Sequence, residues 1–378
     1  MIKLAYRFFI LVVAFAAFIF SSCSKNSLNT GEMEQNNPQN MEPQPICLSV
    51  GVSHTKATIF DSPASLQNPN VGGGNFAVYA FLSGSNSTAA DRSFMENVRV
   101  NYFSAAGDWR FTDSDGIYIK YYWPLGEQLN FFGHFPLNPA DAAVYDVECT
   151  YENGPSFCFS LPLHAYDAAQ ARNEALVNAK TPNQEELREF LYSYVKDQTP
   201  QTQNADKNYP GVKMHFAHPF AAVSFNLEMS YRMTLHNITL GNIKYKGSYS
   251  YNNLSEKWEI AYDSVQGSTG NLLIDIEKGI PDDINFNSPI GGPYLVAPQE
   301  LDKDNGNGAP TLSVNYTRLD GASETKSIKL SDLGVTNWEA GKQYVYTLSM
   351  GNTEEEILFK VKVDKWTVID YKTEIEVE

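Results

Sequence analysis

The sequence predicts an all-β protein, and three observations support that prediction. Apolar residues alternate with polar ones at the period of two that sends successive side chains to opposite faces of a strand. Clusters of Gly, Asn, Asp and Pro separate these runs as turns would. The roughly 330 residues after position 45 exceed one ordinary core and suit two domains of about 150 residues. Many short strands with frequent turns favour β-sandwiches over a parallel α/β sheet.

The first 22 residues have the organisation of an export signal. Lys3 and Arg7 precede an apolar run of 13 residues, 8–20. A membrane-spanning helix needs about 20 apolar residues, so this run indicates a secretory signal that is removed from the mature protein. The two serines before Cys23 resemble a bacterial lipobox, in which the thiol is acylated and the chain is cut just before it. The alternative is an ordinary signal peptide with a chance cysteine.

Residues 23–45 are expected to form a flexible tether between this lipid and the folded protein. The segment is rich in Asn, Gln, Glu, Pro and Ser and has no aromatic residue. Such a composition buries too little apolar surface to offset the entropy of ordering the chain. The predicted protein is therefore exported, anchored by its lipid and folded outside the cytoplasm.

The remaining chain is expected to form two β-sandwich domains, 46–212 and 213–378. A polar stretch, 197–208, is the expected linker between them. The strand pattern is clearest in three segments: Ile46 to Val52, Val223 to Met229 and Ile357 to Val363. One helical interruption is predicted from Thr181 to Tyr194, because Thr181, Pro182 and Gln184 match a helix start and the apolar residues after them have helical spacing.

Two cysteines, Cys149 and Cys158, flank a strong hairpin signal at Asn153-Gly154. A two-residue turn there places the cysteines opposite each other at a position where side chains approach closely, within disulfide range. Pro155 weakens the case, because it cannot donate its ladder hydrogen bond. A disulfide and two reduced, packed thiols both remain open. The sequence assigns no role to Cys47.

No pattern of catalytic or metal-binding residues emerges from the chain. It has no nucleophile elbow, zinc-ligand pair or phosphate-cradling glycine loop. His215 and His218 are expected on opposite faces of a strand, and the calcium-like run from Asp302 to Gly308 lacks the required glycine and glutamate positions. A formal charge of −16 argues against nucleic-acid binding. We expect no cofactor, no metal and no enzymatic activity.

Several motifs resemble those of the fimbrillin-like proteins of Bacteroidales. They appear in the family's order over most of the chain beyond the tether. These motifs are Tyr121-Tyr-Trp-Pro124, Leu129-Asn-Phe-Phe132, Phe135-Pro136, His215-Phe-Ala-His218 running into Ala221 to Leu227, Tyr294 to Gln299, Trp338 to Gly341 with Tyr344-Val-Tyr346, and Val363 to Trp366.

The resemblance implies two transthyretin-like β-sandwich domains that assemble into adhesive surface fimbriae. In that family precursors travel as lipoproteins, which implies a palmitate anchor in the outer membrane and exposure at the cell surface. A trypsin-like protease then removes the first strand, and a strand of another subunit fills the open groove. Here 46–52 corresponds to the removable strand. Lys56 is the only Lys or Arg between Lys25 and Arg92, so it is the expected cut site. The alternation of Thr373, Ile375 and Val377 with glutamates suits a donor strand.

Two alternatives stay open at this point. Lys56 is equally well explained as a solvated loop residue. The chain could also be a monomeric glycan-binding lipoprotein that stacks exposed aromatic rings on sugars, a hypothesis that burial of Trp109, Trp123 and Trp258 would weaken. A host glycan or protein ligand is a further expected partner. Stalk, tip and anchor roles cannot be separated.

Overall fold

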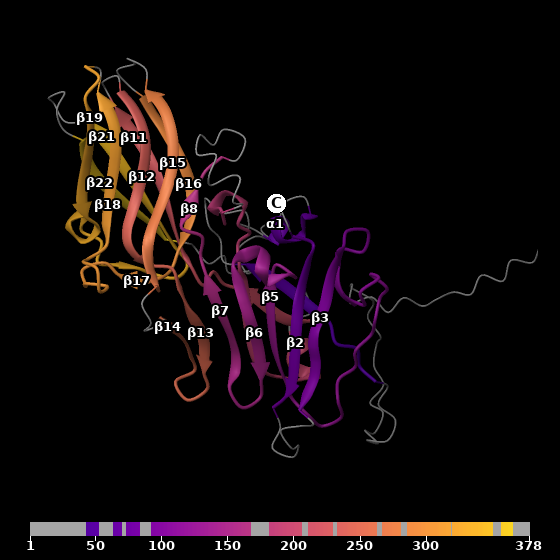
Figure 1. Cartoon of the computed structure of the whole chain (residues 1–378). Coiled ribbons are helices and arrows are strands. Elements are labelled where there is room, and N and C mark those ends of the chain that lie inside the picture. The colour runs from indigo at the N-terminus through magenta and orange to yellow at the C-terminus, as the bar shows by residue number, and fades with distance from the viewer. Residues whose placement is uncertain are drawn as a thin grey trace, which may run out of the picture.

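A computed structural model describes residues 43–52, 63–69, 73–83, 92–167, 181–205, 211–229, 233–262, 267–280, 286–318, 320–350 and 357–365. The signal peptide, Cys23, Lys56 and the proposed donor strand lie outside these residues. The described chain is built almost entirely of strands, so the all-β prediction is confirmed (Figure 1). Its helical elements are short: α1 (Pro63–Gln67), α3 (Pro200–Gln203) and the 3₁₀ turns η3 (Pro139–Ala142), η4 (Gln184–Glu186) and η5 (Leu330–Leu333).

The N-terminal half contains a seven-stranded sheet in the order β10-β1-β4-β3-β2-β5-β9. Its strands are β1 (Leu48–Val52), β2 (Asn75–Leu82), β3 (Ser93–Phe103), β4 (Asp108–Thr112), β5 (Leu129–Phe135), β9 (Leu191–Gln198) and β10 (Val212–Phe216). The two edges of this sheet meet. The amide of Tyr192 donates to the carbonyl of Ala217 (3.1 Å), and the amide of Ala217 donates back (2.8 Å). The sheet therefore curls around its own core.

Inside this curled sheet lies an aromatic core. Phe76, Phe135 and Phe216 pack against one another with ring centroids 4.8–5.2 Å apart. The rings of Trp109 and Phe76 are 5.2 Å apart, nearly edge to face. Such tilted and edge-to-face contacts suit the positive edge and negative face of aromatic rings.

A second, four-stranded sheet, in the order β14-β13-β7-β6, covers the outer face of β5 and β9. Its strands are β6 (Val144–Thr150), β7 (Gly154–Ser160), β13 (Lys246–Asn252) and β14 (Lys257–Tyr262). Aromatic rings fill the space between the two layers. The ring of Trp258 lies 4.4 Å from that of Tyr192, and the ring of Phe157 lies 4.8 Å from that of Phe190.

The C-terminal half is a sandwich of two sheets. One has the order β16-β11-β21-β22, with β11 (Ala221–Met229), β16 (Phe286–Val296), β21 (Lys342–Met350) and β22 (Ile357–Lys365). The other has the order β19-β18-β12-β15-β8, with β8 (His164–Ala165), β12 (Met233–Lys244), β15 (Thr269–Ile280), β18 (Thr311–Arg318) and β19 (Ser323–Lys329). A two-stranded ladder, β17 (Gln299–Glu300) with β20 (Asn337–Trp338), lies beside them.

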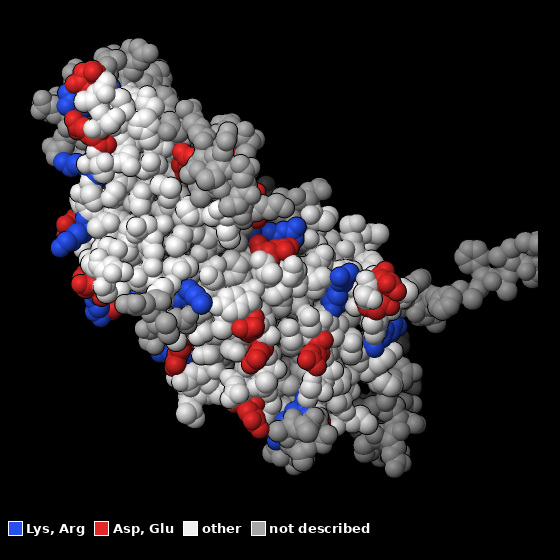
Figure 2. All heavy atoms as spheres, in the orientation of Figure 1, with Lys and Arg blue, Asp and Glu red and all other residues white. Residues whose placement is uncertain are grey.

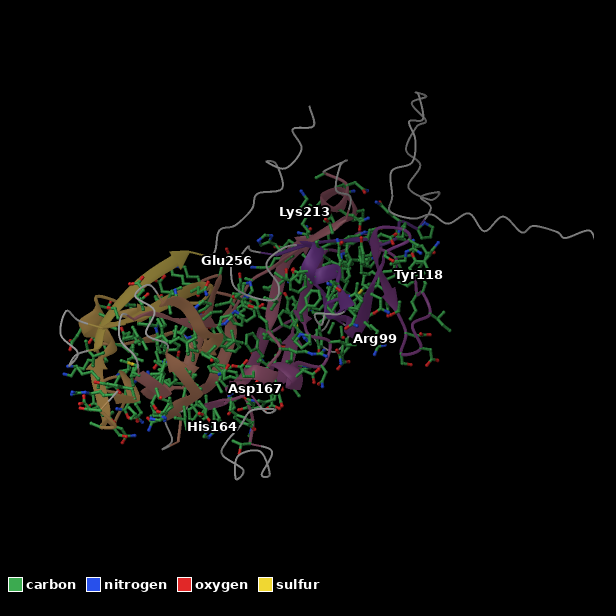
Figure 3. All side chains as sticks on the ribbon, turned by 90° about the horizontal axis from the view of Figure 1, so that it is seen from above. Arg99, Tyr118, His164, Asp167, Lys213 and Glu256 are labelled. Atoms are coloured by element: carbon green, nitrogen blue, oxygen red, sulfur yellow. The ribbon has the colours of Figure 1, made fainter. Side chains whose placement is uncertain are left out.

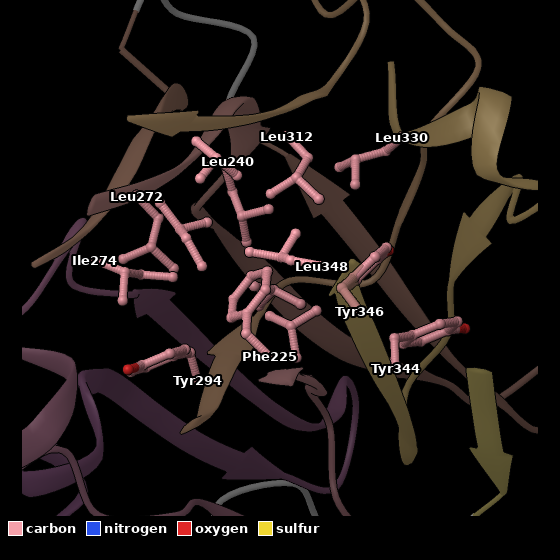
Figure 4. Close-up of a cluster of buried hydrophobic side chains, with 14 of the residues drawn as sticks. Phe225, Leu240, Leu272, Ile274, Tyr294, Leu312, Leu330, Tyr344, Tyr346 and Leu348 are labelled. Carbon is pink, nitrogen blue, oxygen red and sulfur yellow. The ribbon is translucent and has the colours of Figure 1, made fainter. Parts of the chain in front are cut away.

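The core of this sandwich draws on both sheets (Figure 4). Phe225 of β11 and Tyr346 of β21 stack at 5.9 Å, while Leu240 and Leu312 approach from the opposite layer. Trp338 is buried and its indole nitrogen donates to the Tyr346 hydroxyl at 2.9 Å. The hydroxyl and indole groups are thus satisfied inside an otherwise apolar interior, as buried polar groups require.

The two halves exchange strands across the expected boundary near 212. The β13–β14 hairpin follows the first strands of the sandwich in sequence, yet β13 pairs with β7 from Lys246–Ser160 to Ser250–Ser156. In the other direction, β8 pairs in parallel with β15. A third apolar cluster, named here the junction cluster, contains Phe157, Phe190, Phe220, Tyr249 and Leu295. A division at 212 therefore separates the chain by sequence but not by sheet.

The predicted helix between Thr181 and Tyr194 is wrong. Only the single 3₁₀ turn η4 forms, and β9 begins at Leu191. The Gln184 side chain donates to the carbonyls of Pro162 and Leu295 (both 3.0 Å) and accepts from the Leu295 amide (3.1 Å). These tertiary hydrogen bonds outweigh the local helix preference. The same apolar residues also fit a period of two, because Leu191 points into the curled sheet while Tyr192 packs against the second layer.

The hairpin around Asn153 also differs from the prediction. Gly154 has φ +71 and pairs with Thr150, so the loop holds three residues rather than two. Cys149 consequently faces Pro155, and Cys158 faces Tyr145. The expected direct facing of the two cysteines is therefore wrong, and of the two open alternatives the structure has the two thiols. Burial raises the pKa of the Cys149 thiol well above its usual range.

The buried side chain of His134 is expected to make the free energy of unfolding depend on pH in the acid range. Its ring is buried between the layers, stacked on Phe190 at 5.7 Å, and burial lowers its pKa to about 4 from 6.5. Between these values the unfolded chain binds a proton that the folded chain does not. Stability should therefore fall as pH drops from 6.5 to 4, by a total of about 3 kcal/mol. His134→Phe should remove this loss.

Urea unfolding at pH 7 and pH 4.5 would measure the effect. The difference in unfolding free energy between the two pH values should shrink in His134→Phe relative to wild type. An unchanged difference would contradict the assignment to His134.

Candidate functional site

The first strand, β1, is held unequally on its two sides. It pairs in parallel with β10 over its whole length, from Leu48–Val212 to Val52–Phe216. On its other side it pairs with β4 only at Leu48–Trp109. The chain just before the strand is better held, since the Ile46 amide donates to Tyr121 (2.8 Å) and the Gln44 carbonyl accepts from the Trp123 amide (3.0 Å). The predicted strand at 46–52 is confirmed, with its ladder beginning at Leu48.

The apolar face of β1 completes the core of the N-terminal half. Ile46, Leu48 and Val50 are each at most 8% exposed and pack in the same cluster as Trp109 and Phe216. Their spacing of two residues places all three on one face of the strand. Without β1, this aromatic core would open along a groove between β10 and β4. We call this space the β1 groove.

The outward face of β1 is also covered. Cys47 is 8% exposed, Gly51 is buried and Ser49 is half-buried. Gly211, at the start of β10, lies so close that an added Cβ would come within 2.9 Å of the backbone of Leu48. The strand is thus covered on both faces.

One residue that the sequence did not single out holds the beginning of β1. The Gln203 side chain is 3% exposed, accepts hydrogen bonds from the Cys47 amide (2.8 Å) and the Trp123 indole (3.2 Å), and donates to the Pro45 carbonyl (3.0 Å). Gln203 ends the helical turn α3. Thr199 and Thr202 close a capping box around that turn.

The segment 197–208 is therefore more than the polar linker that its composition suggests. Its described part, up to residue 205, contains α3 and reaches back to the first strand. The only sequence signal for this turn is Thr199-Pro200, a helix cap followed by proline at the first helical position.

The histidine pair from the sequence occupies two different environments. His215 is exposed on β10, whereas His218 is buried with its Nδ1 2.7 Å from the Glu189 carboxylate. Within the described ranges, no group of three or more His, Cys, Asp or Glu residues is arranged to hold a metal ion. In the 302–308 turn the Asp304 carboxylate accepts from the amides of Gly306 and Gly308, which occupies one of its oxygens with local backbone.

The three tryptophans whose burial would weaken the glycan-binding hypothesis are mostly internal. Trp109 and Trp123 are at most 8% exposed, and Trp258 is half-buried in the junction cluster. Exposed apolar side chains instead lie in the β4–β5 loop, namely Ile117, Tyr118, Tyr122 and Leu125, and Tyr122 forms a β-bridge with Pro45 just before β1. Tyr118 lies at the end of the N-terminal half farthest from the C-terminal sandwich (Figure 3).

The visible surface carries charge of both signs. Acidic and basic side chains are scattered singly or in small groups over the face in Figure 2, without a continuous basic region. Several charged side chains of the described residues form ion pairs, such as Lys196 with Glu256 at 2.8 Å. Among the described residues, no helix is long and apolar enough to cross a membrane.

These features define an all-β protein whose first strand completes an aromatic core and is enclosed by later parts of the chain. Comparison with known proteins gives the family. The fimbrillin-like family model matches residues 64–366, and the chain belongs to that family.

Several solved structures are similar to the chain at low identity, and the first two below share its fold. A fimbrial protein from Bacteroides vulgatus is 16% identical, with 86% of this chain and 100% of that chain covered and a TM-score of 0.53. A protein of Bacteroides ovatus, to which a role in cell adhesion has been ascribed, is 14% identical (87% and 100% covered, TM-score 0.50). The tip fimbrial protein Mfa3 from Porphyromonas gingivalis is 11% identical (85% and 100% covered, TM-score 0.41). No curated protein matches the chain.

Proposed function

We propose that this chain is a fimbrial subunit that assembles by donor-strand exchange and contributes to cell adhesion. The observation that carries the proposal is the position of β1. This strand fills the core with alternate apolar side chains, yet it precedes the rest of the fold in sequence and pairs with β4 at a single register position. A strand of this kind can be exchanged for another of the same pattern, because ladder hydrogen bonds and alternate side-chain pockets do not depend on chain continuity.

The proposed route begins with a lipoprotein precursor. Cys23 carries the lipid, residues 24–45 span from the outer membrane to the fold, and a trypsin-like protease cuts after Lys56. That cut separates the lipid, the tether and β1 from the rest of the chain. The strand that then occupies the β1 groove comes from another subunit, and the alternating run at Thr373, Ile375 and Val377 makes the C-terminus a candidate donor.

The small outward side chains of β1 limit which donor strand can replace it. A direct replacement with Ile375 in the Leu48 position would put Glu374 and Glu378 where Cys47 and Gly51 are covered. Burial of unpaired carboxylates is costly. A donor with small uncharged residues at these positions would fit the β1 groove better than the chain's own C-terminus does in this register.

Processing at Lys56 gives a direct test on intact cells. The first residue of assembled wild-type protein should be Ala57, and Lys56→Ala should instead retain a lipid-blocked Cys23 and stay out of fibres. Lys56→Arg is the matched control, because a trypsin-like protease accepts either base. N-terminal sequencing and mass spectrometry of surface protein distinguish these forms. Assembled wild-type fibres that keep Cys23 would exclude the processing step.

A further inference from the structure

We propose that Gln203 recognises the backbone of whichever strand fills the β1 groove and thereby fixes that strand's direction and register. The inference rests on the proposed function, because it concerns what happens when the groove is emptied and refilled. It assigns a positioning role to a residue of the helical turn α3, outside the sheet that forms the groove.

The contacts of Gln203 are to backbone atoms of the occupying strand. Its Oε1 accepts from the Cys47 amide at 2.8 Å and its Nε2 donates to the Pro45 carbonyl at 3.0 Å. Every strand carries such groups, so these contacts can be made by a strand of different sequence. The two contacted positions flank Ile46, whose side chain enters the core. Correct pairing with Gln203 is therefore coupled to the insertion of an apolar side chain.

Trp123 fixes which way the Gln203 amide points. Its indole nitrogen donates to the same Oε1 at 3.2 Å. If the amide rotated, its NH₂ group would face the indole N–H, donor against donor. The acceptor of Gln203 is consequently held toward the position of residue 47 and its donor toward that of residue 45.

In a strand that enters in the reverse direction, backbone N–H groups would lie where β1 has C=O groups, and C=O groups where β1 has N–H groups, along the edge that faces Gln203. An N–H of that strand would then meet the Nε2 donor of Gln203. Both groups are buried, and leaving buried polar groups unpaired costs more than a hydrogen bond contributes. Only a strand parallel to β10, in the register of β1, satisfies Gln203 and places its apolar residues in the core.

These contacts determine which residues a strand needs in order to occupy the β1 groove. The occupant is an extended segment with apolar residues at the positions of Ile46, Leu48 and Val50 and a residue other than proline at the position of Cys47. Proline is tolerated two positions earlier, because only the carbonyl is used there, and this chain itself has Pro45 at that place.

The test uses a labelled synthetic peptide of residues 43–52 and the chain from which the first strand has been removed. A specific protease sequence inserted at Lys56 allows removal without the native protease. Complexes are reformed by refolding with excess peptide, and the peptide's dissociation rate is measured. A second peptide carries an ester in place of the amide nitrogen of Cys47, so it cannot donate to Gln203.

The ester peptide should dissociate about tenfold faster than the amide peptide from the wild-type chain, in keeping with the loss of one buried hydrogen bond. In Gln203→Met, a substitution of similar size, the two peptides should differ by less than about twofold, because the partner of that N–H is gone. Gln201→Met, on the exposed side of the same turn, is the matched control and should behave as wild type.

An equal effect of the ester in wild type and Gln203→Met would overturn the inference, because a merely structural glutamine would not distinguish the peptides. If Gln203→Met does not refold with peptide, the measurement uses the Gln203→Met chain that has been cut but still holds its own first strand. That strand should dissociate at least tenfold faster than the first strand of the cut Gln201→Met chain. Failure of the unmodified peptide to bind any of the chains would contradict the proposed function itself, and the inference with it.

Discussion

A chain cut after Lys56 and stripped of β1 is expected to lose most of the stability of its N-terminal half. Ile46, Leu48 and Val50 are buried in the aromatic core. Full burial of three such side chains contributes roughly 5–9 kcal/mol, which is comparable to the whole stability of an ordinary domain, about 5–15 kcal/mol. The stripped chain should therefore unfold, aggregate or take up a strand from another molecule.

Thermal melting and size-exclusion chromatography would follow this loss. The cut chain that retains β1 should melt near the uncut chain, whereas the stripped chain should melt far below it or form large species. Adding the peptide of residues 43–52 should restore melting. A matched peptide with Leu48→Asp should not, since it would bring an unpaired carboxylate into the core. A stripped chain that melts as the uncut chain does would show that β1 is dispensable.

Phe157→Ala is expected to have the second large effect, at the contact between the two halves. Phe157 is 1% exposed, and its ring lies 4.8 Å from Phe190, 5.2 Å from Tyr249 and 5.9 Å from Trp258. These partners come from the N-terminal half and from both strands of the β13–β14 hairpin. Removal of a buried phenylalanine side chain costs about 3–5 kcal/mol.

The loss should appear in two measurements. The free energy of unfolding should fall by about 3–5 kcal/mol. The substitution should also speed the exchange of amide hydrogens in β13 and β14 more than that in the core of the C-terminal sandwich. Leu254→Ala at the tip of the same hairpin is the control, because Leu254 is 97% exposed and should change neither measurement. Uniform loss of protection over the whole chain would argue against a local role for Phe157 in holding the hairpin.

The sequence predicted the elements whose periodicity was unambiguous. Apolar alternation at 46–52, at 223–229 and at 357–363 corresponds to β1, β11 and β22. The family motifs were equally accessible, because tryptophan, tyrosine and proline at strand ends keep their order along the chain. These signals are local, and a single sequence displays them directly.

Of the three misses, two came from interactions between distant segments and one from a local turn conformation. The apolar residues after Gln184 suit both a helix and a strand, and the hydrogen bonds from Gln184 to Pro162 and Leu295 decide between them. The left-handed conformation of Gly154 widened a hairpin by one residue and changed the neighbours of Cys149. Gln203 was missed because its partners lie 156 and 158 residues away in sequence.

The exchange of strands between the halves has a mechanical consequence. Because β13 pairs with β7 and β8 pairs with β15, tension applied to the two ends of a subunit cannot separate the halves without breaking two backbone ladders and the aromatic packing of the junction cluster. A fibre of such subunits under fluid drag would extend little within each subunit. If subunits assemble by the proposed strand exchange, the fibre would stretch mainly at the joints between neighbours, where a single inserted strand would bear the load.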